Sequence, residues 1–227
     1  IFDAIVADSP FTKWEQSIRK DDKPENVKEH YKFYYKLSKQ SGFPEQPILL
    51  DILYVENTYP ETRQVDLNHP FLNTEAPYVQ ITIPTLDSIA GDKLTAFAPA
   101  TIGIPLGKNK EVEIAKQLFD LNLLFERITS HEVVRQSFEQ TAAMCIDKFK
   151  MKFSVEQVYQ DIIDTAFVIA MMGKVKPELH NEVKVGVRSL SNYLDKKANF
   201  GYNIAIAAAA RIAYLAACLM KRIEPQK

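Results

Sequence analysis

Apolar residues in the second half of the chain recur at helical spacing, which predicts an all-helical region from Lys108 onward. Ser, Thr, Gly and Pro residues separate the apolar runs, and Ser154 with Gln157 three residues later fits a capping box. The last run is apolar nearly all round, but Arg211 at its centre argues against a membrane span and favours the core helix of a bundle. We expect helices at about 108–128, 130–150, 154–172, 178–196 and 202–222.

The first half of the chain mixes strand and helix patterns. Residues 1–8 fit a strand or the end of a helix, and residues 10–20 predict a short helix. Residues 24–40 predict an amphipathic helix, although their aromatic residues among lysines also fit stacking on nucleic acid. Residues 47–57 are rich in β-formers and predict a strand buried on both faces. Residues 76–84 alternate polar and apolar positions and predict a half-exposed strand.

Composition limits the function classes. The chain has 227 residues, of which 46% are hydrophobic and 25% charged, as in a soluble protein of one large or two small domains. Its formal net charge of −1 gives no general attraction to nucleic acid or to an anionic membrane, so such binding needs a local basic patch. Cys145 and Cys218 share no motif, and we expect them to be reduced structural thiols of a cytoplasmic protein.

One lysine interrupts an apolar helix stripe. If Thr85 caps a helix, Lys93 falls within the stripe formed by Leu86, Ile89, Ala90, Leu94 and Phe97. A lysine is almost never fully buried without a partner. Either its stem reaches the edge of the helix, so that the ammonium group is solvated, or the ammonium group is held in a cleft where it meets an anion.

Two further charged features stand out. Asp51 lies in the middle of the otherwise apolar strand 47–57, where a carboxylate costs desolvation energy unless a cation compensates it. It fits either a structural salt bridge, with Lys93 as one candidate partner, or a Mg²⁺ ligand for phosphoryl or nucleotidyl transfer. Lys116 and Asp120 lie one turn apart, and a solvated pair at this spacing contributes only ~0.2–0.5 kcal/mol.

Several common site types are absent from the sequence. It contains no GxxxxGK[ST], GxGxxG or GxSxG motif, which removes the P-loop, Rossmann and α/β-hydrolase interpretations. The four histidines have no HxH or HxxxH spacing, so a histidine metal site is not expected.

The order of three segments resembles a known family. ILLDILYVEN, PTLDSIAGDKLTAFAPATIGIP and EIAKQLFDLNLLFE follow one another as in the AbiEii/AbiGii-type abortive-infection nucleotidyltransferase toxins, the toxin halves of bacterial two-component toxin–antitoxin systems. The resemblance is strongest over residues 47–128. It implies an α+β fold, with a partial polymerase-β-type nucleotidyltransferase sheet and helices over residues 1–105 and an all-helical bundle over residues 106–227.

The resemblance also assigns roles. It implies transfer of a nucleoside monophosphate from an NTP to an RNA or protein acceptor, with Mg²⁺ as cofactor. Asp51 matches a catalytic, metal-binding carboxylate, and Lys93 matches a catalytic lysine that binds the triphosphate. Lys116 and Asp120 match a basic-x-x-x-Asp pattern that contributes nucleotide binding and an acidic catalytic residue. Gln117 stands where many members carry an aspartate.

The family's Gly-Ser loop and Asp-x-Asp pair do not occur in this sequence, which begins at Ile1 inside an apolar run. We expect these motifs to precede Ile1 in a longer parent protein and this chain alone to transfer no nucleotide. The expected partners are a cognate antitoxin, an NTP and an RNA acceptor, with no membrane. One alternative is a catalytically inactive, transferase-like binding module that docks an antitoxin or another protein. Another is a housekeeping nucleotidyltransferase without toxicity.

Overall fold

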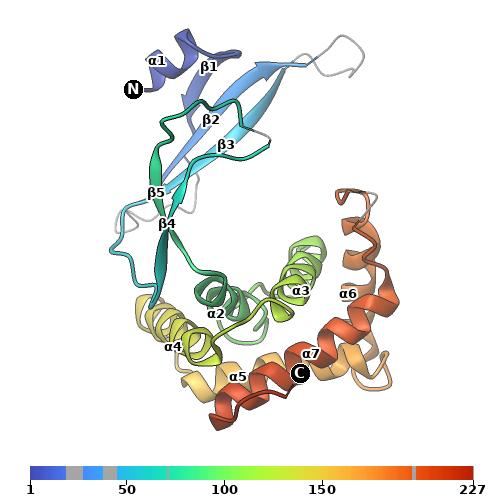
Figure 1. The fold of residues 1–227 in the computed structure, drawn as a ribbon. Coiled ribbons are helices and arrows are strands. Elements are labelled where there is room, and N and C mark those ends of the chain that lie inside the picture. Colours follow the sequence, from blue (N-terminus) through green and yellow to red (C-terminus); the bar gives the residue numbers. More distant parts are fainter. Residues whose placement is uncertain (19–27, 38–44, 71, 196–197, 227) are drawn as a thin grey trace. The chain divides into compact units, whose positions relative to one another are not determined.

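The computed structural model describes residues 1–18, 28–37, 45–70, 72–195 and 198–226. Its contacts divide the chain into unit 1, Ile1–Asn57, and unit 2, Thr58–Lys227. Within these residues, small antiparallel sheets and seven helices make an α+β fold, as the sequence predicts. The elements are α1 (Phe2–Ala7), β1 (Phe11–Gln16), β2 (Lys28–Lys36), β3 (Glu45–Leu53), β4 (Thr62–Asp66), β5 (Gln80–Pro84), α2 (Leu86–Ala96), α3 (Glu111–Phe125), α4 (His131–Lys148), α5 (Val155–Ala170), α6 (Pro177–Leu190) and α7 (Tyr202–Lys221) (Figure 1).

Unit 1 is a three-stranded antiparallel sheet with α1 packed on it. The central strand, β2, pairs with β1 on one side and with β3 on the other. Phe2 of α1 meets Trp14, Tyr31 and Phe33 edge-on, with ring centroids 4.6–5.3 Å apart. Tyr31 and Phe33 are buried, so this aromatic cluster is the small core of unit 1.

Two predicted helices of unit 1 are wrong. Most of segment 10–20 forms β1, and the described part of segment 24–40 is β2 with one residue beyond it. Residues 19–20, 24–27 and 38–40 lie outside the described residues. In β2 the aromatic residues fit a period of 2 as well as one of 3.6, and aromatic side chains favour strands. Pairing with β3 along all nine residues of β2 decides the outcome.

The third strand also differs from its prediction. β3 covers 45–53 rather than 47–57, and it is an edge strand. Most of its apolar side chains are exposed instead of buried on both faces, as Leu49 at 61% and Leu53 at 50% show. One edge of β3 is bonded to β2 and the sheet order places no strand on its other edge among the described residues.

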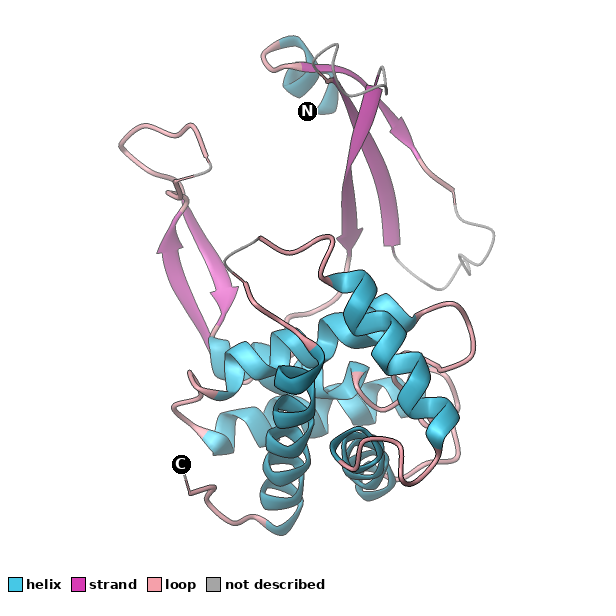
Figure 2. Ribbon diagram, turned by 90° about the vertical axis from the view of Figure 1, so that its right-hand side faces the viewer, coloured by secondary structure: helices cyan, strands magenta, loops and turns pink. Residues whose placement is uncertain are grey.

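Unit 2 combines the β4–β5 hairpin with helices α2–α7 (Figure 2). β5 lies within the predicted strand 76–84, β4 was not predicted, and the five predicted helices after Lys108 are confirmed as α3–α7. The capping box of α5 is also confirmed, because Ser154 and Gln157 bond each other's backbone. α2 packs against α4 and α3, α5 packs against α7, and α3 packs against α6 and α7.

The core of unit 2 includes α7. By length and composition α7 is the one helix among the described residues that meets the criteria for a membrane span. Seven of its residues, Ile212 and Leu215 among them, are buried in this core, as expected for the central helix of a bundle. α2 belongs to the same core through Leu94 and Phe97, so the predicted boundary between residues 105 and 106 lies inside unit 2.

Candidate functional site

Helix α2 directs Lys93 to the edge of the core. The chain leaves β5 at Pro84, and the Thr85 hydroxyl accepts a hydrogen bond from Ser88 N, which caps α2 as predicted. Ala90 and Leu94 are fully buried. The neighbouring position, Lys93, keeps 29% of its side chain exposed, which places its ammonium group at the border between core and solvent.

Helix α3 supplies the partner of Lys93. Ile114, Leu118 and Leu121 bury one face of α3, and Asp120 lies beside that face with 21% of its side chain exposed. Lys93 Nζ donates a hydrogen bond of 2.7 Å to Asp120 Oδ2. Because both groups are partly shielded from water, this charge-assisted bond contributes about 1–2 kcal/mol. Two residues predicted for the site, 27 positions apart, are thus brought together.

The structure combines features of the two interpretations of Lys93. Its ammonium group meets a carboxylate, and 29% of the side chain is exposed. The predicted helical pair is rearranged, because Asp120 binds Lys93 of α2 and Lys116 is exposed one turn earlier on α3. The site therefore has one cation held by Asp120 and a second, solvated cation on the same helix as that aspartate.

Asp51 lies in unit 1, on β3. His30, opposite Asp51 on β2, places Nδ1 2.5 Å from Asp51 Oδ1. The His30 side chain is 7% exposed and that of Asp51 is 58% exposed. The prediction that Asp51 is a buried carboxylate is wrong, because β3 is an edge strand and leaves the group open to water.

Comparison with known proteins decides the family. The family model described as "Nucleotidyl transferase AbiEii toxin, Type IV TA system" matches residues 4–187. The chain belongs to the AbiEii family. No curated protein and no solved structure matches it significantly. The resemblance predicted from the order of three segments is confirmed, and the family indicates a nucleotidyltransferase toxin of a type IV toxin–antitoxin system.

Nucleotidyltransferases of this kind generally use an NTP and a divalent metal, which needs oxygen ligands from the protein. Mg²⁺ prefers carboxylate oxygens together with substrate phosphates and water. The described residues contain no group of three or more His, Cys, Asp or Glu side chains that could hold a metal. Asp51 is paired with a histidine and Asp120 with a lysine. These residues by themselves do not form a metal centre.

Sequence reasoning about this AbiEii chain missed the buried carboxylate that fixes the start of α2. Asp87, 4% exposed, accepts hydrogen bonds from Thr129 N, Thr129 Oγ1 and Ser130 N at 2.7–3.0 Å. Ser130 in turn caps α4. Aspartate is common in the first turn of a helix because the helix dipole stabilises negative charge there. The position of Asp87 therefore did not indicate this long-range contact.

A second missed feature is the close approach of α2 and α4. A Cβ atom on Gly91 would lie 2.3 Å from the carbonyl oxygen of Val134. Near it, Ser137 Oγ donates a 2.6 Å hydrogen bond to the Ser88 carbonyl. The glycine between Ala90 and Asp92 is the sequence signal for this contact. Lys93 of this AbiEii chain is thus carried by a helix that packs closely against α4.

Asp92, next to Lys93, binds the phenol of Tyr59. Tyr59 OH donates to Asp92 Oδ2 at 3.2 Å. Burial, and then the charge of Asp92, raise the pKa of the Tyr59 phenol. Tyr59 is therefore a neutral hydrogen-bond donor that holds Asp92 in place beside the lysine.

Proposed function

We propose that this AbiEii protein acts as the toxin of a toxin–antitoxin system by taking part in transfer of a nucleoside monophosphate from an NTP to an RNA or protein acceptor. The ion pair between Lys93 and Asp120 carries the proposal, together with the family match. This ion pair holds the Lys93 ammonium group in a partly exposed position of unit 2, where we propose that a triphosphate reaches it. Nucleotidyl transfer depends on such positioned cations, because negative charge builds up on the phosphate oxygens.

Each residue of the pair has a distinct role in the proposal. An ammonium group has three N–H donors, and the bond to Asp120 uses one. Lys93 can therefore bind a phosphate oxygen without leaving Asp120, which fixes its direction. Lys116 adds a second, solvated cation on α3 for the same triphosphate. In unit 1, Asp51 is a candidate metal ligand by the family resemblance alone, and the described residues add no second metal-binding group to it.

The proposal assigns residues 1–105 to a partial polymerase-β-type region and residues 106–227 to a helical domain. It assigns no metal-dependent step to the described residues, since they form no metal centre. With no Asp-x-Asp pair in its sequence, we expect the 227-residue chain to bind an NTP and to transfer no nucleotide. Both cysteines are free thiols. We propose a cytoplasmic location, where the protein meets its NTP and an antitoxin.

Calorimetric titration of each NTP tests the binding step. Lys93→Ala is expected to lower the affinity for the NTP at least about tenfold, or 1.4 kcal/mol, because it removes the fixed cation. Asp120→Asn is expected to weaken it less, because the ammonium group remains but loses its anchor. Lys110→Ala removes an exposed lysine just before α3 and is expected to leave the affinity unchanged. Equal affinity of Lys93→Ala and wild type for the NTP overturns the assigned role.

The described residues contain no group of three or more His, Cys, Asp or Glu side chains that could hold a metal, which fits one second function, an inactive transferase-like module that docks an antitoxin or another protein. It predicts that no NTP binds the folded chain in the same titration. A radiolabelled NTP-transfer assay completes the comparison. Mg²⁺-dependent incorporation by the 227-residue chain would contradict both the binding module and the expected inactivity.

A further inference from the structure

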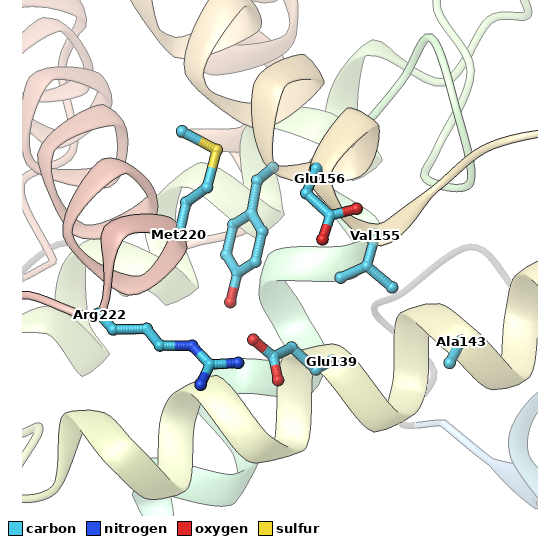
Figure 3. A pocket seen from close by; sticks show the side chains of 7 residues that line it. Glu139, Ala143, Val155, Glu156, Met220 and Arg222 are labelled. Atoms are coloured by element: carbon cyan, nitrogen blue, oxygen red, sulfur yellow. The ribbon is translucent and has the colours of Figure 1, made fainter.

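A cavity of about 360 Å³ lies where α4, α5 and the end of α7 meet. Glu139 and Ala143 of α4 line it, together with three residues at the start of α5 and two at the end of α7. Figure 3 shows the head groups of Glu139, Glu156 and Arg222 directed toward the same space. Sites for small molecules begin at about 300 Å³. Lys93 and Asp120 are not among its lining residues.

A buried hydroxyl without a partner lines this cavity. Tyr159 is 2% exposed, and its hydroxyl has no hydrogen-bond partner among the described residues. Its ring packs against Phe138, with centroids 4.1 Å apart, which keeps the hydroxyl inside the fold. Burial raises its pKa, which keeps the phenol neutral and able to donate and to accept. Buried polar groups almost always have a partner, so a group from outside the chain is expected here.

The charges around the hydroxyl are mixed in sign. Glu139 accepts a 2.8 Å hydrogen bond from Arg135, which fixes its carboxylate. Glu156 adds a second carboxylate from the first turn of α5. Arg222 ends α7 with its backbone in the left-handed region, at φ 55°, and brings a guanidinium group. Val155, Ala143 and Met220 supply apolar wall between these charges.

We propose that this cavity binds a free α-amino acid with an apolar side chain. The carboxylates of Glu139 and Glu156 face its ammonium group, and Arg222 with the Tyr159 hydroxyl binds its carboxylate. The apolar side chain packs between Val155 and Met220. With Arg135 already paired to Glu139, the two carboxylates stand against two guanidinium groups, and this balance of charge favours a zwitterion over a ligand with a single charge. The site does not depend on nucleotidyl transfer, and its failure would leave that proposal untouched.

Three probes of similar shape separate the charge requirements. L-Leucine carries both charges, 3-methylbutylamine only the positive one, and 4-methylpentanoate only the negative one. We expect L-leucine to raise the melting temperature of the 227-residue chain in a dose-dependent manner. In calorimetry we expect each single-charge analogue to bind at least about tenfold more weakly than L-leucine. No shift with L-leucine, or equal binding of the amine, overturns the proposal.

Two pairs of variants test the named groups. Tyr159→Phe keeps the ring and removes the hydroxyl, and Tyr193→Phe, on a 79% exposed tyrosine, is its control. Arg222→Gln removes the exposed guanidinium group, and Arg188→Gln on α6 is its control. We expect Tyr159→Phe and Arg222→Gln to lower the affinity for L-leucine about tenfold or more. The two control variants are expected to bind L-leucine with wild-type affinity. Wild-type affinity in Tyr159→Phe would mean that a water molecule satisfies the hydroxyl and would overturn the proposal.

Discussion

Replacing Gly91 by alanine tests the contact that holds the lysine-bearing helix. The added Cβ would lie 2.3 Å from Val134 O, 2.7 Å from Phe138 N and 2.7 Å from Ser137 Cβ. Two of these atoms belong to the backbone of α4 and cannot rotate away. An ordinary carbon contact begins near 3.4 Å, so α2 and α4 must separate by 3.4 − 2.3 Å, about 1 Å. A gap of about 1 Å forfeits a quarter to a half of the attraction between facing atoms.

The expected loss of stability follows from two opposed terms. Overpacking costs about 1–3 kcal/mol, and the backbone contacts place Gly91→Ala at the upper end of that range. Alanine in place of glycine inside a helix returns about 1 kcal/mol. The net loss is about 2 kcal/mol, which lowers the melting temperature of a domain of this size by about 4–8 °C.

Urea and thermal denaturation followed by circular dichroism measure this loss. Gly201→Ala is the matched control, because nothing lies within 4 Å of its added Cβ at the start of α7. Its stability is expected to stay within about 0.5 kcal/mol of wild type. A Gly91→Ala protein as stable as wild type would refute the close approach of α2 and α4.

Three further changes test other parts of unit 2. Asp87→Ala leaves Thr129 N and Ser130 N without their acceptor and is expected to cost about 3 kcal/mol in urea unfolding; full stability would contradict the buried contact. Ser154→Ala removes the capping box of α5 and is expected to cost about 1 kcal/mol by the same measurement; a loss near zero would contradict it. Burial raises the pKa of the Asp161 carboxyl, so the folded state holds its proton to higher pH than the unfolded state does. The stability from this group is present below the unfolded pKa and is lost as pH rises through the folded pKa. The free energy of unfolding of Asp161→Asn should therefore rise relative to that of wild type between about pH 3 and about pH 7. Parallel curves of unfolding free energy against pH for the two proteins would contradict this.

Local signals predicted the helical half and failed in unit 1. Helices α3–α7 have apolar periodicity and end signals within each helix, so neighbouring sequence is enough to find them. The aromatic residues of β2 fit both a helix and a strand, and the pairing that decides between them comes from β3, whose residues lie between 9 (Lys36–Glu45) and 25 (Lys28–Leu53) positions from their partners. β4 is short and polar, and its partner β5 begins 14 residues after β4 ends. A strand whose stability comes from a distant partner leaves a weak local pattern.

The candidate site shows the same limit. Lys93 was identifiable because a charge on an apolar stripe violates the local pattern, and Asp87 was not, because aspartate in a first helical turn is common. The predicted helical pair of Lys116 and Asp120 used local spacing, whereas the packing of α2 on α3 gives Asp120 a different cation. Sequence reasoning finds a side chain that its own helix cannot accommodate, but the side chain that compensates it comes from another helix.

The partial exposure of this pair separates a structural role from the proposed one. A buried ion pair that serves stability alone can often be replaced by apolar residues without loss, because desolvation cancels much of its attraction. Lys93 and Asp120 keep 29% and 21% of their side chains exposed, so they are incompletely shielded and remain within reach of a solute. Such a pair contributes about 1–2 kcal/mol to folding, a gain that apolar packing can replace, and it also fixes an ammonium group that a phosphate can approach from the solvent side. On this basis we propose that a Lys93→Met/Asp120→Leu protein would fold as stably as wild type and lose NTP affinity, an outcome that a purely structural salt bridge would not produce.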